Sequence, residues 1–237
     1  MNDANDFEGR GSPSFVYREL KSRIINLRYQ VGERLSEARL VEDLGVGRSP
    51  IRMALARLKL EGWVAISPQS GTYIRAMSLR EIREVANLRV LLEKQSAGAA
   101  ATRMSDGVLR SIRKDFDACR AHIIEGSADA FIEFDNKFHE AVYDAADNAL
   151  IQRILFDLRD KVQWIRRVCS ISNERVQEGF SELEVVLNAL ERRDELAAAH
   201  AMESHVESAA AFCERLEKIG AGAFAVDRNS IRTAQGM

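Results

Sequence analysis

The sequence contains little proline, few aromatic residues and only three cysteines. Of 237 residues, 3 are proline and 7% are aromatic, while alanine, leucine, arginine and glutamate fill long stretches. This composition favours a mainly helical chain. The cysteines Cys119, Cys169 and Cys213 are far apart, and no C-x-x-C or Cys/His metal spacing is present. We therefore interpret them as reduced core thiols of a cytosolic protein.

Long hydrophobic runs are also missing. No apolar stretch is long enough to cross a bilayer, and the polar, acidic start "MNDANDFEGR" is not a secretory signal. With 46% hydrophobic and 30% charged residues, the composition is that of a globular protein with a real core. We expect a cytoplasmic protein with no membrane partner.

The net charge of -2 conceals an uneven distribution. Residues 10–76 carry 12 Lys and Arg against 6 Asp and Glu, whereas residues 77–237 carry 22 against 27. A basic first part followed by an acidic second part suggests two domains with different partners. A polyanion such as DNA is the first candidate partner of the basic part.

The first part shows the pattern of a winged helix-turn-helix. A first helix precedes Gly32 and a second covers residues 37–44, where Gly45 supplies the left-handed cap. A third helix starts at Gly47 or Ser49 and ends near residue 61. Residues 63–66 and 72–75 are rich in β-formers and predict a two-stranded hairpin. Apolar residues at helical spacing give the first helix its buried face: Val16, Leu20, Ile24 and Leu27.

The third helix separates into two faces when its residues are placed at 100° intervals. One arc collects apolar residues and predicts a buried stripe. The other places Arg48, Ser49 and Arg52 together at the N-terminal end, where a recognition helix contacts bases and phosphates. Two arginines at this spacing are, by themselves, more often solvated surface residues. The tight turn, the hairpin and the basic surplus favour DNA binding. The predicted stripe is Ile51, Ala54, Leu55 and Leu58.

The second part predicts a helical bundle. Ser78 and Glu81 have capping-box spacing, and helical periodicity then continues to about residue 217 with five breaks. We expect about six helices and a mainly α fold, in which an N-terminal winged helix-turn-helix with a small β-hairpin wing precedes an all-α helical bundle. The expected organisation is a disordered start (1–11), a DNA-binding domain (12–76), a helical effector-binding and dimerisation domain (77–217) and a mobile tail (218–237).

Few residues of the bundle offer ligand chemistry. Asp135 and His139 are four residues apart on one helix face, a spacing that can hold a metal ion. His205 lies on the last helix, which can close on the same cavity. The alternative is a surface hydrogen bond for the Asp/His pair. Arg89 on the first bundle helix has an equally plain alternative, an ion pair with Glu93.

The segment "RLSEARLVEDLGVGRSPIRMALARLKLEGWVAISPQSGTYI" resembles the N-terminal domain of GntR-family transcription regulators. The resemblance implies that Arg48, Ser49 and Arg52 contact DNA and that a wing around Ser70 and Gly71 reaches the minor groove. Gly47 stands where the family often has Ser or Thr, and Met53 where it often has Glu. Both departures bear on the operator preference and not on the presence of a binding surface.

The segments "REVANLRVLLEKQSAGAAA", "FIEFDNKFHEAVYDAADNALI" and "LNALERRDELAAAHAMESHV" resemble the ligand-binding FCD domain of the FadR subfamily. In many members an Asp and three His hold a divalent metal such as zinc beneath a small carboxylate effector. The resemblance implies Asp135, His139 and His205 as ligands, but the fourth position falls on Leu183. Metal binding and its absence are both open on this basis. The resemblance also implies effector binding by Arg89, His139 and His205.

We therefore expect a homodimeric DNA-binding transcription regulator that reads an inverted-repeat operator, responds to a small organic acid and has no catalytic residues. One alternative is a metal-dependent helical-bundle enzyme with an adaptor winged domain. No nucleophile–base pair or full ligand set supports it. A second alternative is an acyl-CoA-responsive regulator, because a pocket without metal could admit a larger ligand.

Overall fold

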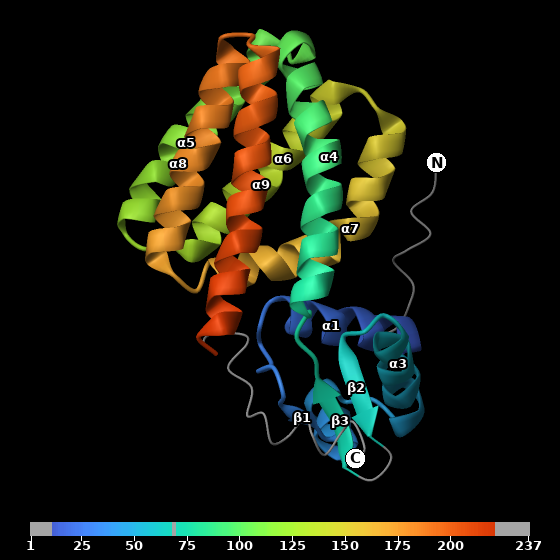
Figure 1. Ribbon diagram of the computed structural model, residues 1–237. Coiled ribbons are helices and arrows are strands. Elements are labelled where there is room, and N and C mark those ends of the chain that lie inside the picture. Colours follow the sequence, from blue (N-terminus) through green and yellow to red (C-terminus); the bar gives the residue numbers. More distant parts are fainter. Residues whose placement is uncertain (1–10, 68–69, 221–237) are drawn as a thin grey trace. The chain divides into compact units, whose positions relative to one another are not determined.

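The chain forms two compact units, shown in the computed structural model of Figure 1, which describes residues 11–67 and 70–220. One unit ends at Met77, and the other runs from Ser78 to Lys218. The predicted disordered start (1–11) and mobile tail (218–237) lie mostly outside the described residues. Each unit is considered by itself.

Three helices and a small sheet make up the first unit, and local caps fix where the helices begin and end. Ser12 accepts a hydrogen bond from the Phe15 amide, and Ser36 accepts one from the Arg39 amide. Gly45 adopts a left-handed φ of 65°, as predicted, and ends the second helix. The elements are α1 (Pro13–Ile25), β1 (Arg34–Leu35), α2 (Glu37–Leu44), α3 (Arg48–Leu60), β2 (Val64–Ser67) and β3 (Gly71–Ile74).

The core of the first unit lies between α1 and α3. All four residues of the predicted α3 stripe are buried, as are Val16, Leu20 and Ile24 of α1. Leu27 was wrongly assigned to the first helix. α1 ends at Ile25, and Leu27 has a φ of 54° in the turn that follows.

The sheet has one strand more than the predicted hairpin. β2 and β3 are antiparallel, with Ser67 opposite Gly71, and β1 pairs with the other edge of β3 through Arg34 and Tyr73. β1 is only two residues long, so it is too short to produce an alternating pattern in the sequence.

The second unit is the predicted bundle, with six helices among the described residues. The capping box of Ser78 and Glu81 starts its first helix. The next four helices also begin at a Ser or Asn whose side chain accepts a backbone hydrogen bond. The mainly α fold class is confirmed. The helices are α4 (Leu79–Arg103), α5 (Asp106–Ile124), α6 (Ala128–Ala146), α7 (Ala149–Cys169), α8 (Asn173–Glu191) and α9 (Glu195–Lys218).

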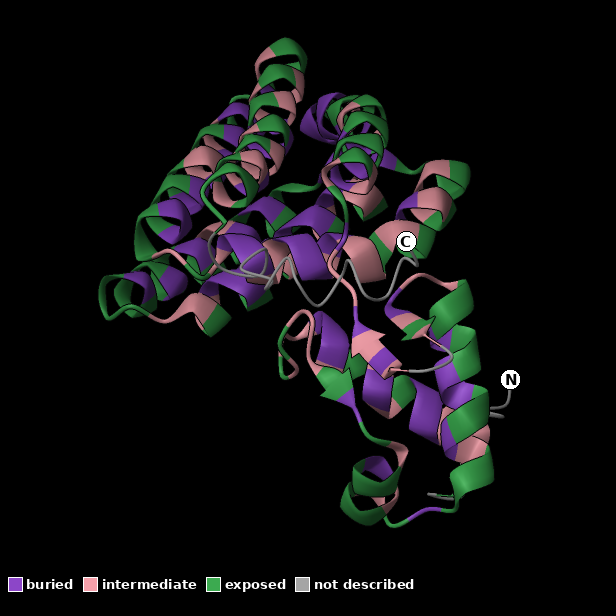
Figure 2. Ribbon diagram, turned by 60° about the horizontal axis from the view of Figure 1, so that its bottom comes forward, coloured by how far each residue is buried: buried purple, intermediate pink, exposed green. Residues whose placement is uncertain are grey.

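A continuous apolar cluster lies between five of these helices. α4 and α9 run side by side, with α8 next to α9 (Figure 1). The rings of Phe116 on α5 and Phe180 on α8 stack with centroids 4.1 Å apart. Buried residues follow one side of each helix, as Figure 2 shows. The fully described helix α7 contributes no residue to this cluster.

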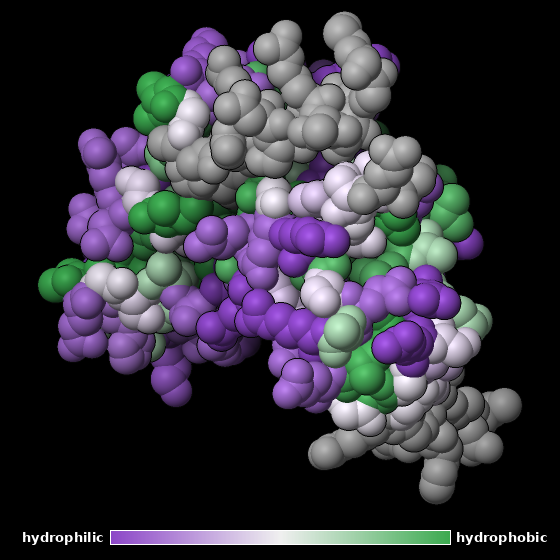
Figure 3. Space-filling view, turned by 90° about the horizontal axis from the view of Figure 1, so that it is seen from below, coloured by the Kyte–Doolittle hydropathy of each residue, from purple (hydrophilic) through white to green (hydrophobic). Residues whose placement is uncertain are grey.

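The described surface is mostly polar. In Figure 3 hydrophilic residues cover much of the visible described surface, with separate smaller areas of hydrophobic residues between them. None of the described helices has an apolar stretch of the length that a bilayer crossing requires.

Candidate functional site

The exposed face of α3 carries the predicted DNA-contacting residues. Arg48, Ser49 and Arg52 are exposed, and so is Met53, while the opposite face is buried. Gly47 is the N-cap and supplies no side-chain hydrogen bond. The first turn of α3 therefore presents two arginines and a serine hydroxyl on one surface.

The two arginines differ in their contacts. Arg52 Nε donates to Glu37 Oε2 on α2 over 2.9 Å. The Arg48 guanidinium has no hydrogen-bond or ion-pair partner among the described residues. One arginine is thus held by α2, and the other is available to a ligand.

The far end of α3 is tied to α1 by a polar cluster around Glu61. The carboxylate of Glu61 accepts from the Tyr17 hydroxyl over 2.7 Å and pairs with Lys21 Nζ at 2.8 Å. Arg57 also pairs with Glu61, at 3.2 Å, and its guanidinium lies 3.7 Å from the centre of the Tyr17 ring. These contacts fix the position of α3 on α1.

The wing requires glycine at residue 71. Gly71 has a φ of 115°, and a Cβ there would lie 2.8 Å from Arg34 Nε on β1. Ser70 precedes it, and its Oγ is buried without a hydrogen-bond partner among the described residues. The hydroxyl of Ser70 therefore does not face solvent, so this part of the wing offers its backbone.

Asp135, His139 and His205 meet inside the bundle. One ligand atom from each lies within 4.8 Å of the others. His139 Nε2 is 3.3 Å from His205 Nε2, and Asp135 Oδ1 is 3.7 Å and 3.5 Å from these two nitrogens. All three residues are buried. α6 supplies the first two and α9 the third, as the sequence predicts.

Two carboxylates orient the imidazoles of this triad. His139 Nδ1 is 2.7 Å from Glu93 Oε2 on α4, and His205 Nδ1 is 2.9 Å from Glu182 Oε2 on α8. Each ring thus bonds a carboxylate through Nδ1 and turns Nε2 toward the other ring. Metal-binding histidines are held in this way in proteins, because the carboxylate fixes both tautomer and orientation.

Three arginines balance the three carboxylates, and two of them, Arg89 and Arg175, are buried. Arg89 bonds Glu93 through Nε and Nη2, and Arg166 on α7 forms an ion pair with Asp135. Arg175 makes two hydrogen bonds to Glu182, of 3.1 Å and 3.0 Å. Each carboxylate of the network is therefore paired with an arginine, as buried charges require. The ion pair of Arg89 with Glu93 is the alternative raised above, and the effector role of Arg89 stays a prediction.

Burial and charge act in opposite directions on these groups. Burial alone would raise the pKa of Asp135, but Arg166 and His139 hold that pKa well below its ordinary value. Burial would likewise raise the pKa of Glu93, which Arg89 and His139 lower instead. Both carboxylates are anionic at neutral pH as a result.

The fourth position implied by the resemblance, Leu183, offers no donor atom to the triad. Leu183 is fully buried in the apolar cluster of the bundle. Its neighbour Glu182 is the residue of α8 that contacts His205. His200, four-fifths exposed, lies 3.7 Å from Glu203 instead.

Sequence reasoning missed four charged residues of this network. Arg166, Arg175 and Glu182 look like ordinary solvated helix charges in the sequence, and Glu93 was considered only as a partner of Arg89. The i, i+7 spacing of Arg175 and Glu182 was the available signal, since residues two turns apart share a helix face.

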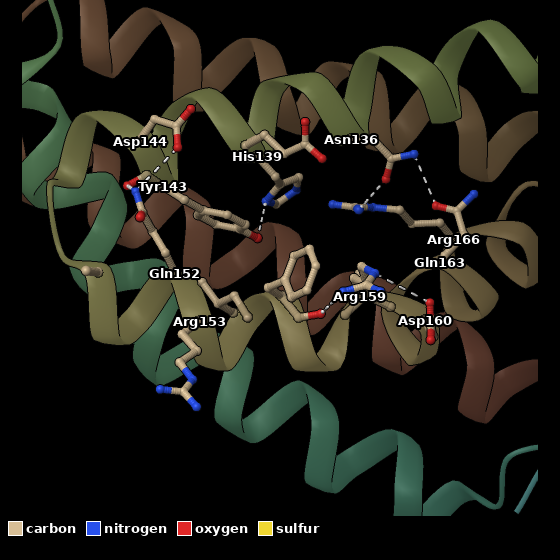
Figure 4. Close-up of a pocket in the computed structure, with 15 residues that line it drawn as sticks. Asn136, His139, Tyr143, Asp144, Gln152, Arg153, Arg159, Asp160, Gln163 and Arg166 are labelled. Atoms are coloured by element: carbon tan, nitrogen blue, oxygen red, sulfur yellow. Dashed lines mark hydrogen bonds and ion pairs between the residues drawn. The ribbon is translucent and has the colours of Figure 1, made fainter. Parts of the chain in front are cut away.

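Two cavities adjoin the triad. A larger one of about 740 Å³ lies along α6 and α7 and includes His139 and Arg166 in its lining (Figure 4). A smaller one of about 30 Å³ includes Arg89, Asp135, Arg166, Arg175 and His205. Arg166 belongs to both linings, so it lies where the two cavities approach each other.

The donor set fits a divalent metal ion. Two imidazole Nε2 atoms and one carboxylate oxygen face a common centre, and this two-histidine, one-carboxylate set binds zinc, iron and similar metals with open positions. The carboxylates on both Nδ1 atoms support the fit.

Family comparison decides what the two units are. Residues 13–74 match the gntR family of bacterial regulatory proteins, and residues 84–208 match the FCD domain. The chain belongs to the GntR family. Its pairing of a GntR domain with an FCD domain agrees with the FadR subfamily.

Two relatives match this chain over most of its length and most of their own. The HTH-type transcriptional regulator YdhC of Bacillus subtilis is 24% identical over 204 residues, covering 86% of this chain and 90% of YdhC. The HTH-type transcriptional repressor RspR of Escherichia coli is 26% identical over 193 residues, covering 81% and 84%.

Solved structures share the fold. Escherichia coli McbR/YncC superposes with a TM-score of 0.67 at 18% identity, covering 86% of this chain and 97% of McbR. A GntR regulator from Rhodococcus sp. RHA1 gives 0.69 at 20% identity with the same coverage.

The two family matches make this chain a DNA-binding transcription regulator with an effector domain. They leave the enzyme alternative without support.

Proposed function

We propose that this GntR protein binds its operator through the exposed face of α3 and releases or retains it according to an organic acid bound near the triad. The main support for this DNA-binding surface is the grouping of Arg48, Ser49 and Arg52 on the first turn of α3, opposite a fully buried stripe. Arginine suits this place because its planar fork contacts guanine or phosphate through two hydrogen bonds. The wing backbone at Gly71 adds a contact with the minor groove.

The working unit is a homodimer that reads an inverted repeat. α4 exposes Leu88 and Leu91, with 37% and 70% of their surface open to solvent, and a second copy can cover this face. A single winged domain buries too little DNA for tight specific binding, and a two-fold dimer matches a two-fold site. Such a regulator works in the cytoplasm, where the chromosome is.

The triad holds one divalent metal ion through Asp135, His139 and His205. The metal supplies a positive charge and open coordination positions for an acidic effector. Glu93 and Glu182 keep both imidazoles turned toward it, while Arg166 holds the second oxygen of Asp135. The effector supplies the fourth ligand of the metal, because Leu183 provides no donor atom.

An effector changes DNA affinity only if it binds two states of the dimer differently. The triad and its charged partners come from α4, α6, α7, α8 and α9, so occupation of the site favours one packing of these helices. The packing in turn sets how far apart the two copies of α3 lie.

Metal analysis and operator binding test this function together. We expect about one equivalent of metal per chain in protein purified without chelator, and its loss in His139→Ala and His205→Ala. His200→Ala is the matched control, because His200 lies on α9 but is exposed and away from the triad. Full metal content in the His205 variant would contradict the ligand set. Operator titration of wild type and Arg48→Ala tests the DNA surface separately.

A further inference from the structure

The large cavity along α6 and α7 has a mixed lining that suits more than a small acid. Its volume of about 740 Å³ falls in the range of roughly 300–1,000 Å³ typical of drug-sized ligands. An acid of a few atoms would leave most of it filled with water. All of its lining residues belong to α6 and α7.

Arg166 brings positive charge to the inner end of this cavity. Its Nη1 donates a hydrogen bond to Asn136 Oδ1, and Asn136 Nδ2 donates one to Gln163 Oε1 (Figure 4). Its Nη2 is buried and has no hydrogen-bond partner among the described residues. A buried guanidinium nitrogen without an acceptor is costly unless a ligand supplies one. Because Nε pairs with Asp135, the same side chain also contacts a residue of the triad.

An aromatic side chain lines the same cavity. Phe156 is 60% exposed and lines the cavity, so its ring is available to a ligand. The guanidinium of Arg159 lies 3.7 Å from the centre of its ring, so the ring has a cation against it. Leu155 and Val162 are buried and add apolar surface to the lining.

We propose that the effector of this protein is an aromatic carboxylic acid whose carboxylate binds Arg166 and whose ring lies against Phe156 in the cavity between α6 and α7. This assignment rests on the proposed function, since it names the class of acid that the regulator senses. A carboxylate matches the planar fork of arginine, and its entry displaces Asp135 or Asn136 from the guanidinium so that Nη2 gains an acceptor. An aromatic ring stacks on Phe156 and covers its exposed surface.

Arg166 then connects the ligand with the triad. The incoming carboxylate competes with the Asp135 carboxylate for the guanidinium of Arg166, because both acids bind the same nitrogen atoms. Occupation of the cavity therefore changes the surroundings of Asp135 without any direct contact between effector ring and metal.

Calorimetry with four acids tests the assignment on the full-length metal-loaded protein. The probes are acetate, succinate, decanoate and 2-naphthoate. We expect 2-naphthoate to bind at least tenfold more tightly than the other three and to change operator affinity. Tighter binding of decanoate would overturn the aromatic class. Binding of acetate or succinate alone would overturn the inference and leave the metal-centred regulator intact, whereas binding of none would overturn both.

Three variants locate the binding residues. Arg166→Gln should weaken 2-naphthoate binding by about 10- to 100-fold, since it removes hydrogen bonds to a charged group. Phe156→Ala should weaken it about 3- to 10-fold. Arg167→Gln is the matched control, because Arg167 follows Arg166 on α7 but pairs with Asp129 and is not among the residues that line the cavity. It should change binding less than twofold.

Folding and charge are checked separately. Phe156 is largely exposed, so its alanine variant keeps the fold even if Arg166→Gln disturbs the Asp135 pair. Arg166→Lys keeps the charge but not the fork and should recover only part of the affinity. Unchanged 2-naphthoate affinity in both Phe156→Ala and Arg166→Lys would overturn the assignment.

Discussion

Arg52 on α3 donates a 2.9 Å hydrogen bond to Glu37 on α2. One arginine of the proposed DNA surface is therefore held by an acid of the preceding helix, while Arg48 beside it is unpaired among the described residues. Glu37 also places a negative charge beside the proposed DNA surface.

Replacement of this acid should strengthen DNA binding. Glu37→Gln releases Arg52 and removes one repulsion with phosphate, and an exposed pair of this kind is worth up to about 1 kcal/mol, or about fivefold in affinity. We expect a two- to fivefold gain on operator and non-operator DNA in fluorescence anisotropy titrations. Arg39→Gln changes another exposed charge of α2 and should weaken binding or leave it unchanged, never strengthen it. A loss of affinity in Glu37→Gln would show that Glu37 positions Arg52 for binding.

The arginines themselves should separate by role. If Arg48 or Arg52 bonds guanine through both nitrogens, its replacement by Ala costs about 1–3 kcal/mol and relaxes preference at one base pair. If it bonds phosphate, affinity falls for all sequences and the salt slope decreases by about one. Titrations at several salt concentrations on matched operator variants distinguish these results. Unchanged binding in both variants would remove α3 from the interface.

Glu182 should matter to the metal although it is not a ligand. Glu182→Gln weakens the hydrogen bond that holds His205 Nδ1 and keeps the side-chain size. Loss of such a partner lowers metal affinity by about 10- to 100-fold. Competition with a chromophoric chelator measures this, with Glu184→Gln as control because Glu184 is on α8 but pairs with Arg120. Equal affinity in both variants would mean that Glu182 serves only Arg175.

The polar cluster on Glu61 should make the first unit sensitive to acid. Burial would raise the pKa of Glu61, but Lys21, Tyr17 and Arg57 together lower it. A lowered folded-state pKa adds stability that is present above the unfolded value, near 4.3, and is lost as pH falls through the folded value.

Glu61→Gln should therefore lower the free energy of unfolding by about 1 kcal/mol at pH 7 and flatten its decline below about pH 4.5. Urea titrations followed by Trp63 fluorescence in a Trp164→Phe background report the first unit alone. If the free energies of unfolding of the wild-type protein and of Glu61→Gln fall in parallel with decreasing pH, the role of Glu61 is contradicted.

Gly179 on α8 should tolerate no side chain. A Cβ there would lie 2.9 Å from Cζ of Phe131 on α6, inside van der Waals contact. Overpacking of this kind costs about 1–3 kcal/mol, which exceeds the gain of helix propensity from alanine. Gly107→Ala near the start of α5 is the control, since only the Ser105 side chain lies nearby, at 3.9 Å. Thermal unfolding followed by circular dichroism should show a lower midpoint only for Gly179→Ala.

The sequence predicts some parts of this molecule well because they depend on local spacing. The buried stripe of α3, the cap at Gly45 and the capping box at Ser78 each involve residues within one or two turns. The Asp135–His139 pair is of the same kind, and His205 was added because the last helix of a bundle can close on the same cavity, which the family resemblance then supported.

The other members of the network depend on packing between helices. Glu93 and His139 are 46 positions apart, and Arg166 and Asp135 are 31 apart, so no periodic pattern joins them. Charged residues on amphipathic helices ordinarily face water. Only the bundle shows that these charges point inward, and only the sheet shows that residues 34 and 35 form a strand.

The uneven burial along α7 has a consequence for its backbone amides. Its first half buries only Leu155, whereas its second half buries Val162, Trp164, Ile165, Val168 and Cys169, so amide protons of residues 149–160 should exchange with deuterated water sooner than those of α6 or α9. A ligand held between α6 and α7 would slow this exchange and leave the rest of the bundle nearly unchanged. The half of α7 that contributes least to the core is thus the part whose opening an effector can most readily suppress.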